Sequence, residues 1–143
     1  FVPNEIMYNA MLIAALSGVD IQMIIPHKSD SWIADTCTYS YLGEILDAGV
    51  KVYKYQEGVM HSKAIVIDDY ISIVGSANLD ERSFNQNFEV NAFVYDQKTA
   101  SELKKQFEAD KAHCQPITAE DWHNRTIIQK LIESIARLFS PII

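Results

Sequence analysis

Basic clusters are missing from this chain, in which 12 lysines and arginines are outnumbered by 19 acidic residues and the net charge is −7. Proteins that bind nucleic acid generally carry a basic patch that displaces counterions from the phosphates. The charge of the chain therefore argues against a nucleic-acid partner and against a nuclease activity.

Long apolar runs are missing as well. A membrane-spanning helix needs about 20 consecutive apolar residues, and no such run occurs here. The N-terminus also lacks the charged and apolar regions of a signal peptide. We therefore expect this segment to be soluble and to contain no transmembrane helix.

Cysteine is scarce, with only Cys37 and Cys114 in 143 residues. The two lie far apart in helix-like patterns, and their spacing is not that of a disulfide framework or a metal site. We predict two free, buried thiols, no metal and no other cofactor. The hydrophobic content of 48% is that of an ordinary globular protein, and the length suits one domain, residues 1–143.

Helical and β-rich segments alternate along the chain. Hydrophobic periodicity with capping and breaking residues predicts these elements in order: helix 5–16, strand 19–25, helix 31–48, strand 50–55, strands 64–67 and 70–74 in a hairpin, strand 88–95, helix 97–113, and a last helix after a helix start at Thr118. The order predicts an α/β fold with a mixed β-sheet flanked by helices on both faces.

The stretch 61–89 concentrates side chains that can act on a phosphate. His61 and Lys63 stand two residues apart at the head of a strand, which places both on one face. The hairpin exits into Gly75-Ser76-Ala77-Asn78, small residues that allow close backbone approach and offer hydroxyl and amide donors. Phosphodiester transfer needs a nucleophile or acid and donors for the non-bridging oxygens, and this stretch contains both.

These residues form the pattern HxK(x4)D(x6)GSxN, which resembles the signature of the phospholipase D superfamily, and the match is complete. The resemblance implies that His61, Lys63 and Asp68 belong to the catalytic motif. It also implies that Lys63, Ser76 and Asn78 bind the phosphate without a metal, and that Glu89 is an acid that orients His61. Side chains alternate between the two faces of a strand, so Asp68 should lie on the opposite face from His61 and Lys63. This position favours a structural anion over a reacting group.

Flanking segments resemble one branch of that superfamily, the bacterial cardiolipin synthases: FVPNE, IPHKSD, GSANLDERSFNQNFEVN and ARLFSPI. The resemblance implies transfer of a phosphatidyl group between two phosphatidylglycerol molecules through a phosphohistidine. It further implies a full-length protein at the bacterial cytoplasmic membrane, anchored by segments upstream of this chain. The chain holds one motif, so we expect a fragment whose second motif comes from an upstream half or a homodimer mate.

Two other functions remain open at this stage. One is a homodimeric single-motif phosphodiesterase or nuclease, which would complete its site from two copies. The other is a non-catalytic module that binds lipid or protein.

Two further features have open roles. His27 and Lys28 follow a strand and could meet a head group or form an ordinary exposed loop. The last helix carries an apolar stripe, which we expect to pack on protein, either this domain or another half, more than on a membrane surface. The stripe comprises Ile128, Leu131, Ile132, Ile135, Leu138 and Phe139.

Overall fold

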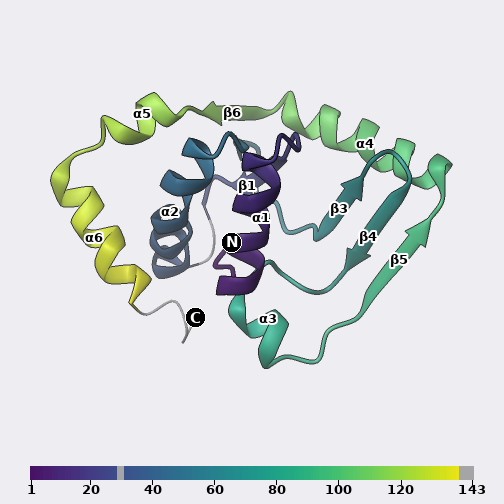
Figure 1. Ribbon diagram of the computed structural model, residues 1–143, viewed down its shortest axis with the longest axis horizontal. Coiled ribbons are helices and arrows are strands. Elements are labelled where there is room, and N and C mark those ends of the chain that lie inside the picture. The colour runs from purple at the N-terminus through teal and green to yellow at the C-terminus, as the bar shows by residue number, and fades with distance from the viewer. Residues whose placement is uncertain (29–30, 139–143) are drawn as a thin grey trace.

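The computed structural model describes residues 1–28 and 31–138, and its fold is α/β, as predicted (Figure 1). The helices are α1 (Glu5–Leu16), α2 (Trp32–Asp47), α3 (Glu81–Asn85), α4 (Gln97–Lys111), α5 (Ala119–His123) and α6 (Ile127–Arg137). The strands are β1 (Gln22–Pro26), β2 (Lys51–Tyr55), β3 (Ala64–Ile67), β4 (Ile71–Gly75), β5 (Asn91–Tyr95) and β6 (Cys114–Ile117).

The strands form two separate three-stranded sheets, whereas the sequence predicted one mixed sheet. The first sheet, β1–β2–β6, is mixed because β1 and β2 are parallel and β6 is antiparallel to β2. The second sheet, β3–β4–β5, is antiparallel throughout. Figure 1 shows the second sheet at the opposite end of the molecule from α2 and α6.

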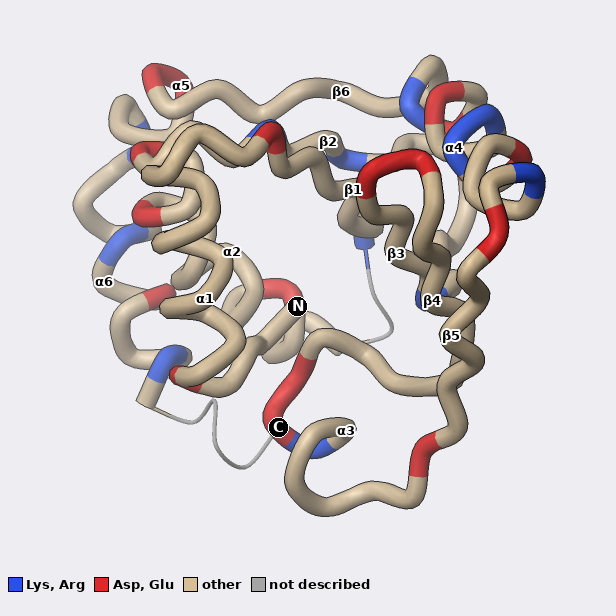
Figure 2. Tube along the Cα trace, turned by 45° about the vertical axis from the view of Figure 1, so that its right-hand side comes forward, with Lys and Arg blue, Asp and Glu red and all other residues tan. Residues whose placement is uncertain are grey.

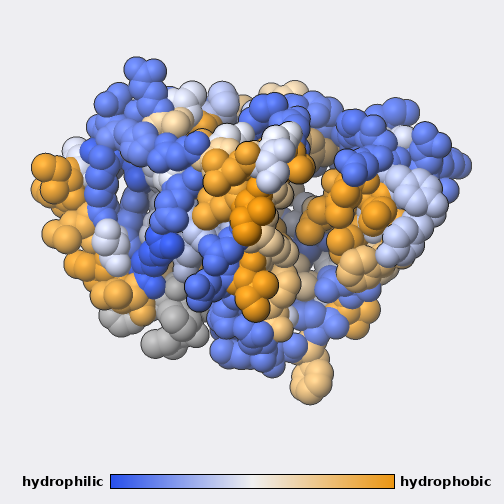
Figure 3. All heavy atoms as spheres, viewed as in Figure 1, coloured by the Kyte–Doolittle hydropathy of each residue, from blue (hydrophilic) through white to orange (hydrophobic). Residues whose placement is uncertain are grey.

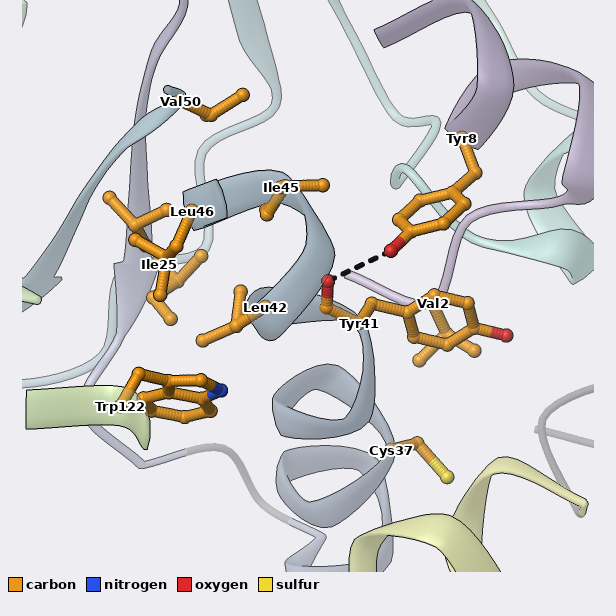
Figure 4. Packing of buried hydrophobic residues seen from close by; sticks show 11 residues of the cluster. Val2, Tyr8, Ile25, Cys37, Tyr41, Leu42, Ile45, Leu46, Val50 and Trp122 are labelled. Carbon is orange, nitrogen blue, oxygen red and sulfur yellow. Dashed lines mark hydrogen bonds between the residues drawn. The ribbon is translucent and has the colours of Figure 1, made fainter. Parts of the chain in front are cut away.

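The hydrophobic core lies under the first sheet, where α2 is packed (Figure 4). Leu42 and Ile45 of α2 and Val52 of β2 are almost completely buried. The Tyr8 hydroxyl of α1 donates a 3.1 Å hydrogen bond to the carbonyl oxygen of Tyr41, which fixes α1 on α2. Burial of each large aliphatic side chain stabilises the fold by about 1.5–3 kcal/mol, so this end of the molecule is its scaffold.

Strand β6 was not predicted, because Pro116 lies within it and proline interrupts most strand patterns. In the structure β6 pairs with β2 alone, and Pro116 lies opposite Tyr53. A strand with one neighbour has one outward-facing edge, where the missing amide proton of proline removes no ladder hydrogen bond.

The predicted hairpin between β3 and β4 is confirmed. Its turn is formed by Asp68 and Asp69, whose φ angles of 50° and 56° lie in the left-handed region, and the Tyr70 amide donates to the Ile67 carbonyl at 3.1 Å. Aspartate enters this region more readily than most residues, and two successive positive φ angles match the twist of a hairpin.

The amphipathic helix α6 turns its charged side inward. Glu133 is buried and paired with Arg125, and the Arg137 guanidinium donates to Glu44 of α2 at 2.8 Å. The predicted stripe faces outward instead, with Ile128 71% and Leu131 60% exposed. The stripe therefore does not pack on this domain, and packing on another half, the other form of the prediction, stays a prediction. Phe139 lies outside the described residues.

The helices of the described residues include none that is both long and apolar enough to cross a membrane.

Both cysteines are free, as predicted. Cys37 is fully buried and its thiol lies 3.2 Å from the Ala136 carbonyl, whereas Cys114 is half-buried. Burial raises the pKa of both thiols, so neither has the low pKa of a reactive cysteine.

Candidate active site

The candidate site lies at one end of the second sheet, where three strands align Lys63, Gly75 and Asn91 in one row. The Gly75 amide donates to the Lys63 carbonyl at 3.2 Å, and Gly75 pairs with Asn91 across β4 and β5. A Cβ atom at position 75 would overlap the Asn91 side chain and the Val90 carbonyl. Glycine is therefore required here by close packing of two backbones.

Ser76 continues this contact beyond the end of β4. Its amide donates to the Val90 carbonyl at 3.0 Å, and the Val90 amide donates to the Ser76 hydroxyl oxygen at 3.0 Å. The same hydroxyl donates a short hydrogen bond to the Glu89 carboxylate. Ser76 thus joins the exit of the hairpin to the acidic residue that the sequence singled out.

The Glu89 carboxylate is held by three side chains. Besides Ser76, it accepts hydrogen bonds from the Ser83 hydroxyl at 3.0 Å and from the Asn87 amide at 3.3 Å. These bonds, with that from Ser76 the strongest influence, and the nearby charge of Lys63 lower the pKa of Glu89 below its ordinary value. Glu89 is therefore an anion at neutral pH.

Ser83 lies in the loop that follows Asn78 and contacts Glu89. It lies in the short helix α3, which Asp80 caps by accepting a 2.7 Å hydrogen bond from the Ser83 amide. The Ser83 hydroxyl also accepts a 3.1 Å hydrogen bond from the backbone amide of Asn78. Ser83 therefore orders the loop and connects Asn78 to Glu89. Aspartate is a preferred residue at a helix N-cap. Asp80, three residues before Ser83, is therefore the sequence signal that could have indicated a short helix here.

His61 and Lys63 directly precede β3, outside regular secondary structure. The Lys63 ammonium donates a 2.8 Å hydrogen bond to the His61 carbonyl, and the His61 side chain is exposed. In the described ranges 1–28 and 31–138, no hydrogen bond joins His61 to Glu89. The orienting role of Glu89 therefore stays a prediction, and its contacts in the structure are with Ser76, Ser83 and Asn87.

Asp68 is not brought to this cluster. It lies in the turn at the far end of β3, about 20 Å from His61 if the strand rises roughly 3.3 Å per residue. Figure 2 shows this acidic turn beside α4, where Asp69 pairs with Lys104 at 2.6 Å. The position supports the structural role inferred from the strand phase, and a direct contact of Asp68 with the same phosphate as His61 has no geometric support.

His27 follows directly after β1, and its backbone amide donates to the Tyr55 carbonyl at 3.1 Å. Its Nδ1 atom is buried and has no hydrogen-bond partner in the described residues. The rest of the loop, Ser29 and Asp30, lies outside those residues.

The cluster is chemically suited to a phosphate. Lys63 supplies a cation, the Asn78 side chain supplies a neutral donor, and His61 supplies an imidazole that can attack or protonate. The Ser76 hydroxyl, predicted as a further phosphate donor, gives its proton to Glu89 in this structure. Divalent cations prefer several carboxylate oxygens, and no group of three or more metal-ligating side chains occurs in the part of the chain that the structure describes. The donor set fits non-bridging phosphate oxygens.

Solved structures identify the class of fold. The chain is similar to the phospholipase D family member Nuc from Salmonella typhimurium, with a TM-score of 0.70, 18% identity, and coverage of 81% of this chain and 76% of that one. A phosphatidylserine synthase from Haemophilus influenzae matches with a TM-score of 0.70 and 16% identity over 99% of this chain and 38% of its own. At these identities the likeness establishes the fold alone: this is a phospholipase D-type domain.

The family follows from the sequence. Residues 1–111 match the model of the family described as cardiolipin synthase, PLD-like domain, and the chain belongs to this family. It is 43% identical over its whole length to a cardiolipin synthase of Halalkalibacterium halodurans and 46% identical to cardiolipin synthase 1 of Staphylococcus aureus. The chain spans 28% and 29% of the length of these two relatives.

Proposed function

We propose that this chain carries one of two catalytic motifs of a phosphatidyltransferase of the cardiolipin synthase type. The substrate is phosphatidylglycerol, and a phosphatidyl group passes from one molecule to a second. The observation that supports this proposal is the row of Lys63, Gly75 and Asn91 with the Ser76–Glu89 contact beside it. The row joins Lys63 of the HxK segment to Gly75 of the GSxN segment at one end of the sheet.

The reaction has two displacements at phosphorus. In the first, an imidazole nitrogen forms a bond to phosphorus, the bond from phosphorus to the glycerol oxygen breaks, and a second histidine gives its proton to the departing glycerol. In the second, a hydroxyl of the acceptor phosphatidylglycerol gives its proton to that histidine and attacks phosphorus. The phosphorus–nitrogen bond breaks and cardiolipin is released.

The residues of this chain have separate tasks in the proposal. His61 is either the nucleophile or the acid of the pair. Lys63 and Asn78 stabilise the charge on the non-bridging oxygens, while Ser76 holds the hairpin exit against Val90. Glu89, an anion fixed by Ser76 and Ser83, favours the protonated imidazole and thereby stabilises charge that forms during transfer.

A second motif is required, because this chain contains one histidine of the pair. In the proposal, another part of the same protein supplies it and the whole protein acts at the bacterial membrane that holds its substrate. The net charge of −7 supports a lipid over a nucleic acid as substrate.

Trapping the covalent intermediate tests the proposal. A protein of the relatives' length that contains this chain is mixed briefly with labelled phosphatidylglycerol and digested, and the adduct is located by mass spectrometry. We expect a phosphatidyl adduct on His61 or on the histidine of the second motif, and loss of cardiolipin formation in His61→Ala by at least about 1,000-fold. The matched control is His113→Ala, which changes a histidine paired with Glu57 away from the site.

Full cardiolipin synthesis by His61→Ala, or the absence of an adduct on either histidine in an active protein, would contradict the mechanism. The homodimeric alternative gives a different result: the isolated 143-residue chain would hydrolyse a soluble phosphodiester with a specific activity that rises with its concentration.

A further inference from the structure

Helix α6, together with its C-cap residue, presents an apolar face to solvent. The residues of this face recur three or four positions apart, so they lie along one side of the helix. We call them the outer face of α6: Ile127, Ile128, Leu131, Ile132, Ile135 and Leu138. Each is between 41% and 84% exposed, and Figure 3 shows apolar residues along α6 at the left edge of the view. An apolar surface of this extent marks a contact site.

The opposite side of α6 is bound to the domain by charged groups. Glu133 is buried and pairs with Arg125. The Arg137 guanidinium donates to Glu44 at 2.8 Å, and its Cζ atom lies 4.6 Å from the centroid of the Tyr41 ring. Turning the helix to bury its outer face would break these contacts and leave partly buried charges without partners, which is costly. The outer face is therefore exposed because the helix is held in this orientation.

The outer face has the chemistry of hydrocarbon. All six residues are isoleucine or leucine, and their side chains have no group that donates or accepts a hydrogen bond. Protein interfaces favour aromatic residues and arginine, which combine apolar area with polar groups. Acyl chains offer apolar contact alone. A purely aliphatic face is therefore matched better by lipid than by a protein surface.

The charge of the segment favours the same partner. Residues 124–138 contain three basic residues and one acidic residue, so this part is net positive although the whole chain carries −7. The acidic residue is the buried, paired Glu133. Lys130 is exposed, and it lies next to Ile127 on the helix surface because the two are three residues apart. Basic residues near a bilayer are attracted to anionic head groups, and they accompany the apolar face of helices that lie on membranes.

The position of α6 keeps its outer face apart from the candidate site. Figure 1 shows α6 at the end of the molecule opposite the second sheet, with α1 and α2 between them. The second histidine of the proposed function has to reach His61, which precedes β3 of that sheet. Completion of the site therefore does not require the outer face to be covered by protein.

We infer that the outer face of α6 rests on the surface of a phospholipid bilayer, with its isoleucine and leucine side chains among the acyl chains. The choice of lipid rests on the proposed function, whose substrate is a phospholipid, and the inference adds the element of this chain that touches the bilayer. The sequence favoured a protein partner for this helix, but it did not show that the charged side is the buried one. Because that side stays bound to α2, the helix lies along the bilayer and fixes the orientation of the domain on it.

Photo-cross-linking in a membrane tests the inference. Leu131 is replaced by p-benzoyl-L-phenylalanine in a protein of the relatives' length, which is reconstituted in phosphatidylglycerol vesicles and irradiated. Adducts are located by digestion and mass spectrometry, and we expect a phospholipid adduct at position 131. The same probe at Lys105, on the exposed side of α4, is the matched control and should give at least about tenfold less lipid adduct. Ile128→p-benzoyl-L-phenylalanine repeats the test should the Leu131 variant misfold.

Three other results would overturn the inference. A cross-link from position 131 to a peptide outside these 143 residues would show that another part of the protein covers the outer face. A cross-link between two identical copies would show a homodimer contact, and equal lipid adducts at positions 131 and 105 would show that the face stays in water. The readout does not depend on activity. If the lipid adduct forms on a protein that makes no cardiolipin, the proposed function fails and the bilayer contact stands.

Discussion

The two sheets differ most in how far their apolar side chains are buried. In the first, Val52 and Ile25 are almost completely buried beneath α2. In the second, Ile65, Phe93 and Tyr95 are between 37% and 63% exposed. The sheet that bears the candidate site is thus the one that lacks a complete core of its own, and the difference separates scaffold from reaction surface.

The polar contacts show the reverse distribution. Around the second sheet, Ser76, Ser83 and Asn87 converge on Glu89. Around the first, rings and aliphatic groups meet, as in the edge-to-face contact of Tyr8 and Tyr41 at 5.2 Å between centroids. Hydrogen bonds fix direction, whereas apolar burial supplies most of the free energy of folding. The second sheet therefore depends on the rest of the protein for stability and supplies the orientation of the site.

Matched isoleucine substitutions measure the difference directly. Ile45→Ala in α2 removes a fully buried side chain, and we expect it to lower the free energy of unfolding by about 3 kcal/mol. Ile65→Ala in β3 should cost only about 1 kcal/mol, because Ile65 is 37% exposed. Urea denaturation of the 143-residue chain checks both values. Equal costs would show that the second sheet is as well packed as the first.

Gly75→Ala tests whether backbone packing holds the site. The added methyl group would overlap Asn91 and the Val90 carbonyl, and separating β4 from β5 should cost about 2 kcal/mol. We expect loss of the Ser76 and Val90 amide protection in hydrogen exchange. Gly43→Ala is the control, because a Cβ there makes only ordinary contact with Trp122. Unchanged amide protection in Gly75→Ala would show that the two backbones can separate without loss of the contact.

Much of the fold could be predicted from the sequence, because local signals define most elements. Helix α1 has the predicted bounds, since Asn4 caps it and Gly18 ends the apolar pattern. Strand β3 also has the predicted bounds. Short helix α3 was missed because it carries no periodic apolar pattern, and strand β6 was missed because Pro116 lies within it. The division into two sheets was missed because pairing between strands depends on tertiary contacts that periodicity does not encode.

The site could be predicted in part. The motif resemblance identified Ser76 and Glu89, which the structure joins by a hydrogen bond. The contacts of Ser83 and Asn87 with Glu89 were not predicted, because they depend on how the loop after Asn78 folds back through α3. The outward stripe of α6 was missed for a related reason. Amphipathicity shows that a helix has two faces, and the buried Arg125–Glu133 pair decides which face is inward.

Glu89→Gln separates the orienting role from the structural one. We expect turnover of the whole protein to fall about 10–100-fold while the fold is retained, as for other residues that orient a catalytic group. Glu102→Gln, on the exposed side of α4, is the control. Turnover equal to that of the control variant would remove Glu89 from the mechanism.

The pKa of Glu89 gives the same variant a pH signature. Because the folded-state pKa is lowered, the contribution of this carboxylate to stability is present above its ordinary pKa of 4.5 and is lost as the pH falls through the lower folded value. Glu89→Gln should therefore reduce the dependence of stability on pH in that acidic range. Thermal unfolding of the unmodified protein and of Glu89→Gln between neutral and acidic pH measures the effect. The same dependence of stability on pH in the two proteins would show that Glu89 does not contribute to it.

The smallest effect is expected at the ion pair of Lys104 and Asp69, which fastens α4 to the hairpin turn of the second sheet at 2.6 Å. Both side chains are 54% exposed, so solvent and salt screen the attraction. A double-mutant cycle with Lys104→Ala and Asp69→Asn measures the pair, and asparagine keeps the positive φ of the turn. We expect a weak coupling at low ionic strength that disappears near about 1 M salt. A coupling that persists at high salt would mean that this pair is shielded from solvent, and the second sheet would then be held to α4 more firmly than its exposed apolar face indicates.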